Sequence, residues 1–577
     1  MDLSIIIINW NTAYLLMECL DSVYKSIGDF QYEVIVVDNG SCDGSVEAIG
    51  YNFPQTRIIQ NQSNVGFAKA NNMALKTVTG RYALLLNSDT CVYPDTVKRF
   101  VEYMDNENDV AACCGQLYDR DGTKQNSYSV FPSLITELLN KSLLKLLMPW
   151  WYPSKWKVYN VPADIDAVIG ACMMVRMADI NEIGMFDEDY FFFFEETDWC
   201  KRAHDHLKKI VFIPHARIMH AQGQSVSKDY VSSSIEYYRS RYIYFRKHKN
   251  RLESFLLRVG LGVKLCIDMI INMLGFVVTL SCTRRYRQKL FILFNIMLWH
   301  LKLCPKRYGL SFIYPCRGQI SFKDGKLNVS VCVITFNEEK NIRECLESVK
   351  WFGQIIVLDS QSTDKTVEIA REYTDKVYQV PWEGFSKNKN MCIEKATKEW
   401  VFVIDADERV TSELANECTL LYGDNNGYSV ARKNFFLCRW IKSCGWYPDY
   451  SVRLFKNGKG KFKERMVHEA VHIEGKKGKL HNPLLHFTYT SIRQFIGRLN
   501  RYSTLAAKEM QRDPERDYSK KKALLFAELL IRPQFTFFKM YIIKYGFLDG
   551  LYGFVISSMY AYYVFLKYAK LYERTKK

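Results

Sequence analysis

The chain begins with the stretch Ser4-Ile-Ile-Ile-Ile-Asn-Trp-Asn11 and repeats it as Ser330-Val-Cys-Val-Ile-Thr-Phe-Asn337, 326 positions later. Both versions are β-branched apolar runs that end in an aromatic residue followed by Asn. At the same spacing, Glu18-Cys-Leu-Asp-Ser-Val23 returns as Glu344-Cys-Leu-Glu-Ser-Val349. Two matching blocks at one spacing predict two copies of one domain.

The repeat continues further along the chain with small changes in spacing. Asp38-x-x-Ser-x-Asp43 returns as Asp359-x-x-Ser-x-Asp364, at an offset of 321. At an offset of 318, Gly66-Phe-Ala-Lys-Ala-Asn-Asn-Met73 returns as Gly384-Phe-Ser-Lys-Asn-Lys-Asn-Met391, and Asn87-Ser-Asp89 returns as Asp405-Ala-Asp407. Offsets that change only between blocks are typical of insertions in surface loops.

The order of apolar runs predicts an α/β fold. An apolar run at 4–8, an amphipathic helix around 15–24 and a second apolar run at 34–37 form a βαβ unit. Such a unit implies a mostly parallel sheet whose functional loops follow the carboxyl ends of the strands. The second copy repeats this order, with strands expected at 331–335, 355–358 and 401–404. We therefore expect two Rossmann-like domains in tandem.

Composition narrows the function classes. The 577 residues are 48% apolar and 24% charged, which is ordinary for packed protein, and the formal net charge is +17. No nucleic-acid-binding fingerprint accompanies that charge, so we expect no nucleic acid partner. The 17 cysteines contain no Cys-x-x-Cys pair, which argues against zinc ribbons and favours a reducing compartment. Without a recognisable secretory signal at the start, the expected location is the cytoplasm.

Residues 250–305 differ from the rest of the chain. The stretch 265–282 is apolar apart from Asp268 and Asn272, and 290–301 is apolar again, with Arg284-Arg-Tyr-Arg287 between them. A membrane-spanning helix needs about 20 apolar residues. Helices lying on the membrane surface are therefore favoured over a spanning hairpin, although ordinary packed helices remain an alternative. The aromatic and basic tail at 524–571 permits the same interpretation.

The polar residues that end the strands suit a nucleotide-sugar donor. A carboxylate after the second strand can accept a hydrogen bond from the base. An acidic residue after the fourth strand can hold a divalent cation that bridges the two phosphates. A lone Asp-x-Asp is weak, but here it recurs in register with the other repeated blocks.

These blocks together resemble the family 2 glycosyltransferases of the GT-A fold, over most of both repeats. The resemblance implies that Asp38 and Asp359 bind the nucleotide base and that Asp405 and Asp407 form the metal-binding Asp-x-Asp. In the first copy that motif reads Asn87-Ser-Asp89, so Asp89 is its one charged ligand.

The first copy resembles the rhamnosyltransferase branch. The matching blocks are Gly170-Ala-Cys-Met-Met-Val-Arg176, Gly184-Met-Phe-Asp-Glu188 and Phe194-Glu-Glu-Thr-Asp-Trp-Cys-Lys-Arg202. In that branch a Glu-Asp pair supplies the catalytic base. Here Glu196 takes the Asp position, and Asp198 follows as a second catalytic candidate. His220, in a His-x-x-Gly-x-Ser pattern, is a candidate metal ligand.

The second copy resembles the lipopolysaccharide core glucosyltransferase branch. Asp449-x-x-x-Arg453 has the same spacing as Asp198-x-x-x-Arg202, which favours Asp449 as the base. Glu469, in a His-Glu pair, is the rival. His486 holds the late position of His220 and is a further candidate metal ligand.

The resemblance also implies the donor-binding residues and the cofactor. Donor contacts are expected from Asn11, Asp38, Lys69, Asn72, Asn87, Asn337, Asp359, Lys387, Asn390 and Asp405. The cofactor is expected to be Mg²⁺ or Mn²⁺. The first donor would be dTDP-rhamnose or a similar sugar nucleotide, and the second a UDP-hexose.

The resulting hypothesis is a bifunctional, inverting glycosyltransferase on the inner face of the cell membrane, acting on a lipid-linked or lipopolysaccharide-type acceptor. Its expected parts are a first GT-A domain at 1–249, a helical linker at 250–325, a second GT-A domain at 326–500 and a helical segment at 501–577. Two alternatives remain open. The chain could be a copolymerase with alternating sites, or one copy could be a degenerate module that only binds.

Overall fold

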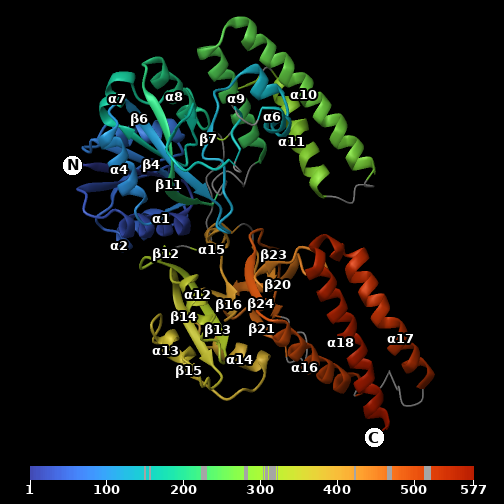
Figure 1. Ribbon diagram of the computed structural model, residues 1–577. Helices are drawn as coiled ribbons and strands as arrows, with labels where there is room; N and C mark the ends of the chain where they lie inside the picture. Colours follow the sequence, from blue (N-terminus) through green and yellow to red (C-terminus); the bar gives the residue numbers. More distant parts are fainter. Residues whose placement is uncertain are drawn as a thin grey trace. The chain divides into compact units, whose positions relative to one another are not determined.

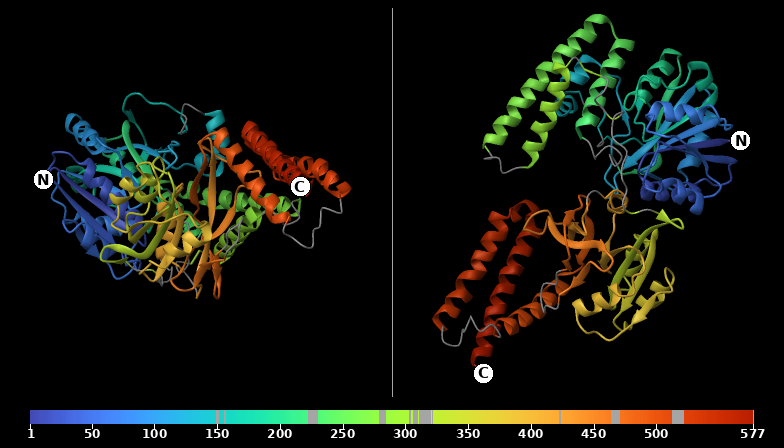
Figure 2. Two further views of the ribbon diagram at one scale, coloured as in Figure 1. Left: turned by 90° about the horizontal axis from the view of Figure 1, so that it is seen from below. Right: turned by 180° about the vertical axis from the view of Figure 1, so that it is seen from behind.

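The computed structural model places the chain in two compact units, Met1–Arg317 and Gly318–Lys577 (Figure 1). It describes residues 1–577 except 149–150, 155–156, 222–229, 279–283, 303, 306–309, 311–319, 321, 422–423, 464–470, 512–521 and 577. Each unit contains a mixed β-sheet, and each carries a pair of long helices beside that sheet, which are visible again in the two views of Figure 2.

The elements of unit 1 follow one another as β1 (Leu3–Asn9), α1 (Ala13–Ser26), β2 (Tyr32–Asp38), α2 (Ser45–Asn52), β3 (Arg57–Gln60), α3 (Phe67–Leu75), β4 (Tyr82–Asn87), β5 (Thr90–Val92), α4 (Thr96–Asn106), β6 (Val110–Tyr118), β7 (Tyr128–Ser129), α5 (Leu134–Leu138), α6 (Lys141–Leu147), β8 (Ala163–Asp164), β9 (Ala167–Val168), β10 (Cys172–Arg176), α7 (Met177–Ile183), α8 (Glu195–Asp205), β11 (Lys209–His220), α9 (Tyr230–His248), α10 (Arg251–Val278) and α11 (Arg284–Leu301).

The elements of unit 2 are β12 (Phe322–Lys323), β13 (Lys326–Thr335), α12 (Ile342–Glu347), β14 (Phe352–Asp359), α13 (Thr366–Arg371), β15 (Val377–Gln379), α14 (Phe385–Ile393), β16 (Trp400–Asp405), β17 (Glu408–Arg409), α15 (Ser412–Thr419), β18 (Gly427–Phe436), β19 (Arg439–Trp440), β20 (Asp449–Lys456), β21 (Gly460–Phe462), β22 (Val471–Ile473), β23 (Lys477–Lys479), β24 (Leu484–Tyr489), α16 (Ile492–Gln511), α17 (Lys522–Phe538), a π-helical turn (Lys539–Ile543), a 3-10 turn (Gly546–Asp549) and α18 (Gly550–Lys576).

The two sheets have the same topology. Unit 1 has the strand order β3-β2-β1-β4-β10-β6-β11-β5, and unit 2 has β15-β14-β13-β16-β20-β18-β24-β17. In both, the first four strands are parallel and the fifth is antiparallel to the fourth. Matching elements strand by strand confirms the expected fold class: two Rossmann-like α/β domains in tandem, with helical segments after each.

Burial explains why the repeated runs form the centre of each sheet. Strands β1 and β4 in unit 1, and β13 and β16 in unit 2, are almost wholly buried apolar residues. Central parallel strands are covered on both faces, so their sequences are continuous apolar runs. Their polar residues therefore come at the ends, and the register sets Asp38 beside Asn9 and Asp359 beside Thr335.

The stretches expected to contact a membrane are helical. Residues 251–278 and 284–301 form α10 and α11 of unit 1, drawn in green in Figure 1, and α17 with α18, drawn in red, forms a hairpin in unit 2. Within the described parts of the chain, none of the helices has the length and apolar content required to cross a bilayer.

Candidate active sites

A left-handed Asn shapes the first loop of each site. Asn11 has φ of 55° and Asn337 has φ of 53°. The Asn11 N–H donates to Ser41 Oγ at 2.9 Å, and its Oδ1 accepts from the Cys42 N–H at 2.9 Å. Asn337 makes the same two bonds, to Ser362 Oγ and from the Thr363 N–H, both at 2.8 Å. Both Asn residues therefore fasten the loop that follows the second strand.

The Asp at the end of that second strand is buried in both units. Asp38 accepts from Asn9 Nδ2 at 2.8 Å and from the Ser41 N–H at 2.9 Å. Asp359 accepts from the Ser362 N–H at 2.8 Å. Neither residue has any exposed surface. These carboxylates therefore stabilise the conformation of the loop that follows the second strand.

A second pair of Asn residues clamps a helix to a distant loop. Asn72 donates through Nδ2 to the Phe186 carbonyl at 2.8 Å and accepts at Oδ1 from the Phe186 N–H at 3.1 Å. Asn390 makes the matching pair of bonds with the main chain of Phe462, both at 2.9 Å. Both amides bind backbone groups of that loop, and their contact with a donor stays a prediction.

The lysines selected from the sequence lie on the outside. Lys69 on α3 and Lys387 on α14 are exposed, and Lys387 pairs with Glu383 at 3.6 Å. The residue that α14 directs into the site is Lys389, two positions later and only 6% exposed. Sequence analysis missed Lys389. The one feature that could have identified it is the presence of a Lys where the first copy has Asn71.

An Asp and a His face each other in both units. His220 Nε2 lies 3.5 Å from Asp89 Oδ1, and His486 Nε2 lies 3.4 Å from Asp407 Oδ2. A main-chain bond of 2.9 Å accompanies each pair, from the residue after His to the carbonyl of the Asp. The last long strand of each sheet, β11 or β24, supplies the His. The structure therefore brings together residues that sequence analysis proposed as metal ligands on separate grounds.

An amide side chain orients each of these His rings. Gln125 Oε1 lies 3.1 Å from His220 Nδ1, and Asn434 Oδ1 lies 2.7 Å from His486 Nδ1. A carbonyl oxygen only accepts hydrogen bonds, so this contact favours a proton on Nδ1 and leaves Nε2 to face the carboxylate. Partners of this kind fix the tautomer of metal-binding His residues. Sequence analysis missed both amides, because neither belongs to a repeated block.

The His Nε2 atom and the Asp carboxylate that face each other are suitable ligands for a divalent cation. A neutral imidazole nitrogen and a carboxylate oxygen are both good ligands for such an ion. Across the residues that the structure describes, no cluster of three or more His, Cys, Asp and Glu side chains forms a complete cage. Two protein ligands are nevertheless sufficient where the diphosphate of a substrate completes the coordination.

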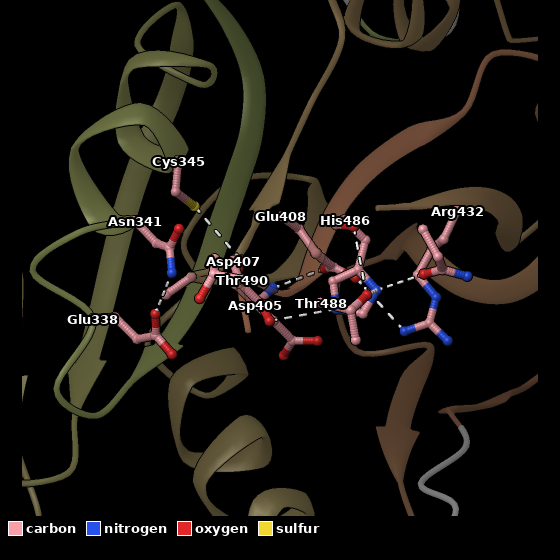
Figure 3. Close-up of polar contacts among 12 residues, drawn as sticks. Glu338, Asn341, Cys345, Asp405, Asp407, Glu408, Arg432, His486, Thr488 and Thr490 are labelled. Atoms are coloured by element: carbon pink, nitrogen blue, oxygen red, sulfur yellow. Dashed lines mark hydrogen bonds and ion pairs between the residues drawn. The ribbon is translucent and has the colours of Figure 1, made fainter. Parts of the chain in front are cut away.

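In unit 2 the first Asp of the motif, Asp405, which Figure 3 shows with Glu408, belongs to a buried ionic network. Asp405 lies 2.9 Å from Lys389 Nζ and 3.2 Å from Arg453 Nη2. Arg453 also contacts Glu408, which has no exposed surface and accepts from the Asp405 N–H at 2.9 Å. Burial opposes ionisation of Asp405, but Lys389 and Arg453 overcome it and hold the pKa well below its usual range.

Unit 1 has neutral residues at all of the matching positions. The offset of 318 between Asp89 and Asp407 equates Asp405 with Asn87, Lys389 with Asn71 and Glu408 with Thr90. Strand pairing equates Arg453 with Met173, since Leu454 pairs with Phe402 as Met174 pairs with Leu84. Asn87 is neutral, and the residues at the matching positions in unit 1 are neutral as well. The first site therefore has no buried charge without a partner at these positions.

Glu196 lies in the first turn of α8. Its Oε1 accepts from Thr197 Oγ1 at 3.4 Å, and its Oε2 has no hydrogen-bond partner among the described residues. Gly170, two residues before β10 begins, adjoins this carboxyl group. Burial raises the pKa of Glu196 to about 7. Burial and the adjacent Glu196 raise the pKa of Glu195 well above its usual range.

Asp198 has a different environment on the same helix. It is wholly buried and contacts Arg202 at 3.0 Å, Lys247 at 2.8 Å and His248 at 2.8 Å. Burial acts to raise its pKa, but the hydrogen bonds from His248 and Lys247 lower it well below its usual range. The residue fastens α8 to α9.

The shared Asp-x-x-x-Arg spacing does not mark equivalent positions, although Asp449 stays a predicted base. Asp198 and Arg202 are one turn apart on a helix, where residues i and i+4 meet. Asp449 and Arg453 lie on strand β20, where that separation spans about 13 Å. Arg453 instead joins the Asp405 network, while Asp449 accepts from Arg432 Nε at 3.0 Å. Glu469 lies outside the described residues.

Asp449 is the first residue of β20, which takes the place of β10 in the strand order. In unit 1, Gly170, which adjoins the Glu196 carboxyl group, lies two residues before β10 begins. Asp449 is thus a carboxylate at the same end of the matching strand.

Comparison with known proteins agrees with this geometry. The family model "Glycosyl transferase family 2" matches residues 4–183 and 330–439. The lipopolysaccharide core biosynthesis glycosyltransferase LpsC of Rhizobium meliloti is 31% identical over 264 residues, which cover 43% of this chain and 93% of LpsC. An N-acetylglucosaminyl-diphospho-decaprenol L-rhamnosyltransferase of Mycobacterium tuberculosis is 23% identical over 37% of this chain and 73% of its own length.

Among solved structures, the mannosyltransferase PcManGT of Pyrobaculum calidifontis, in complex with GDP-Man and Mn²⁺, is similar with a TM-score of 0.34 and 16% identity. The match covers 52% of this chain and 86% of that one. The family model matches just over half of this chain, in the same part of both units. The chain is a glycosyltransferase and belongs to glycosyl transferase family 2.

Proposed function

We propose that the chain is a bifunctional glycosyltransferase in which each unit transfers one sugar from its own nucleotide-sugar donor. The observation that carries this proposal is the recurrence of the Asp–His pair, with its orienting amide, at the same place in both sheets. A module retained only for binding has no need of this arrangement. LpsC has about the length of one unit, which also fits a tandem of two enzymes.

The names of the relatives suggest the acceptor. One relative acts in lipopolysaccharide core biosynthesis, and another is a rhamnosyltransferase whose acceptor is a decaprenol-linked sugar. We propose a lipid-linked or lipopolysaccharide-type acceptor, with UDP- or dTDP-sugars as donors. The proposed location is the cytoplasmic face of the membrane, in peripheral contact with it, because α10 and α17–α18 expose many apolar side chains.

In the first site Glu196 would remove the proton from the acceptor hydroxyl as the new glycosidic bond forms. Its pKa of about 7 suits a general base at neutral pH. Asp198 would act as a positioning residue, because it holds α8 against α9 through Lys247 and His248. Direct displacement assisted by one base inverts the configuration of the sugar carbon.

Mg²⁺ or Mn²⁺ would be held by Asp89 and His220 in the first site and by Asp407 and His486 in the second. When bound, such a cation neutralises charge on the leaving nucleoside diphosphate. Gln125 and Asn434 keep the His Nε2 lone pairs directed at this place. In the second site Asp449 is the proposed base, and Glu469 is the alternative.

Release of nucleotide from a panel of sugar nucleotides tests the proposal, with full-length wild type, Asp89→Ala and Asp407→Ala. We expect each substitution to abolish turnover of a different donor. Matched controls are Asp109→Ala and Glu474→Ala, whose carboxylates are 49% and 68% exposed and lie on salt bridges away from the sites. If Asp89→Ala changes no donor turnover, the first unit is a binding module and the bifunctional proposal fails.

A further inference from the structure

The turn between α17 and α18 exposes an unusual amount of apolar surface. We call residues 538–551 the corner segment; it contains the π-helical turn, the 3-10 turn and the adjoining helix ends. Seven of its apolar or aromatic side chains are between 44% and 73% exposed: Phe538, Ile542, Ile543, Tyr545, Phe547, Leu548 and Leu551. A contiguous exposed apolar patch on a folded protein marks an interaction site.

The exposed charged side chains of the corner segment are all positive. Lys539 and Lys544 are exposed. The one acidic residue, Asp549, is 5% exposed and accepts hydrogen bonds from the N–H groups of Lys442 and Ser443 at 3.1 and 2.9 Å. The apolar patch therefore carries positive charge and no exposed carboxylate.

Basic and aromatic side chains continue this surface onto the β19 hairpin. Arg439 lies over the ring of Tyr552 at 4.9 Å. Trp440 is contacted by Lys433 at 4.6 Å and by Lys442 at 4.7 Å. Trp beside Lys and Arg is the combination found where proteins meet the polar boundary of a membrane.

The corner segment is fastened to the loop that ends at the proposed second-site base. The Cys444 N–H donates to the Lys544 carbonyl at 3.0 Å, and Asp549 binds Ser443 as described above. This loop continues directly to Asp449, where β20 begins. The corner segment is therefore joined to the loop that leads to Asp449.

Unit 1 has an independent surface of similar chemistry along α10. Its exposed apolar residues follow steps of three and four over the whole helix: Leu252, Leu256, Val259, Val263, Ile267, Ile270, Leu274 and Val277. They form one face about 38 Å long. Two of the cationic side chains of α10 make contacts within unit 1: Lys264 donates to the Glu137 carbonyl, and Arg258 lies over Tyr242.

We infer that the corner segment and this α10 face both insert into the headgroup boundary of an anionic phospholipid bilayer, each holding its own unit on the membrane. At the corner segment, the exposed Lys442, Lys539 and Lys544 beside the apolar patch are complementary to anionic lipid. A second copy of this chain is less suitable as the occupant there, because this basic surface would face another basic surface. The proposed function enters only in making Asp449 the group that meets a lipid-linked acceptor.

The test is co-sedimentation of the full chain with vesicles of phosphatidylcholine alone, or of equal parts phosphatidylcholine and phosphatidylglycerol. The corner variant is Ile543→Glu/Phe547→Glu/Leu548→Glu, and the α10 variant is Val263→Glu/Ile267→Glu/Ile270→Glu. Each should lower the affinity for anionic vesicles by at least about tenfold, and together they should abolish binding. Tyr51→Glu/Leu207→Glu, at positions 64% and 91% exposed, is the control and should bind normally.

Charge is tested separately. Lys442→Gln/Lys539→Gln should reduce the preference for anionic over neutral vesicles while leaving the apolar patch intact. Circular dichroism and donor hydrolysis without acceptor establish that each variant is folded, and Asp407→Ala should bind vesicles like wild type even though its second site is inactive. A failure of the enzymatic proposal is thereby distinguished from a failure of the membrane proposal.

Either of two results would overturn the inference. One is wild-type binding that the corner and α10 variants leave unchanged. The other is a wild-type dimer, measured by light scattering, that the corner variant converts to a monomer, since the patch would then be an interface between copies of the chain.

Discussion

Two carboxylates on α8, two residues apart, have opposite properties. Asp198 is surrounded by Arg202, Lys247 and His248, which keep it ionised. Among the described residues, Glu196 forms no ion pair with a cationic side chain, and burial raises its pKa to about 7. A proton acceptor needs an affinity for protons near the working pH, which Glu196 has and Asp198 lacks.

Glu196→Gln should lower the rate of the first transfer by about 100-fold to 10,000-fold, because a positioned base contributes that much. Folding should be unaffected, since Gln keeps the shape of the side chain. The measurement is single-donor turnover, with Glu182→Gln on the exposed side of α7 as the control. Retention of wild-type first transfer would remove Glu196 from the mechanism.

The pH profile of the first site follows from the same pKa. Burial raises the pKa of Glu196, so the protonated form predominates below about pH 7 and cannot accept a proton. We expect kcat/KM for the first donor to fall as the pH decreases through about 7 and to reach a plateau above it. A profile that stays flat from pH 6 to 8 would contradict this assignment.

Lys389 is predicted to matter because it is the buried partner of Asp405. Lys389→Asn leaves that carboxylate with Arg453 alone, and should destabilise the chain by about 1–3 kcal/mol and slow the second transfer. Adding Asp405→Asn, which recreates the neutral pair of unit 1, should restore most of the stability. Lys387→Asn, on the exposed side of α14, is the matched control in calorimetry.

At the scale of elements, strands β11 and β24 deliver the His residues. Each of these strands pairs with the short strand that follows the Asn-Ser-Asp or Asp-Ala-Asp motif. In unit 1, β5 aligns Thr90 with His220, and in unit 2, β17 aligns Glu408 with His486. The same pairing in both sheets explains why the two Asp–His distances agree within 0.1 Å.

The amides that orient these His rings should control metal affinity. Asn434→Leu removes the acceptor of the His486 Nδ1 proton, and Gln125→Leu does the same for His220. Each should raise the Mn²⁺ concentration for half-maximal turnover of one donor by about 10-fold to 100-fold. The two variants control for each other, because each should leave the other donor unchanged; an unaltered metal requirement in both would exclude this orienting role.

At the scale of the whole molecule, two separate donor sites predict a limited product. With both donors present, mass spectrometry should show acceptors that carry one or two added sugars. A copolymerase with alternating sites would give a ladder of products instead. Asp89→Ala and Asp407→Ala should each stop the series at a defined point, and the order of addition then follows from which variant leaves the acceptor unmodified.

The sequence by itself determined the duplication, the α/β fold and the loops at the strand ends. These features depend on residues close together in the chain: an apolar run forms a central strand, and the polar residue after it lies at the sheet edge. Asn11 with Asn337, Asp38 with Asp359, and Asp89 with Asp407 are found at matching places for that reason.

Only the tertiary structure decided which distant groups meet. Gln125 and Asn434 reach their His residues through strand pairing, which no local pattern encodes. The spacing of Asp449 and Arg453 misled because four residues form one turn of a helix but a long extent of a strand. Lys389 rather than Lys387 reaches Asp405, because the orientation of α14 against the sheet selects which side of the helix is buried. The sequence gives the chemical type of each side chain, whereas strand register and helix packing determine which side chains contact one another.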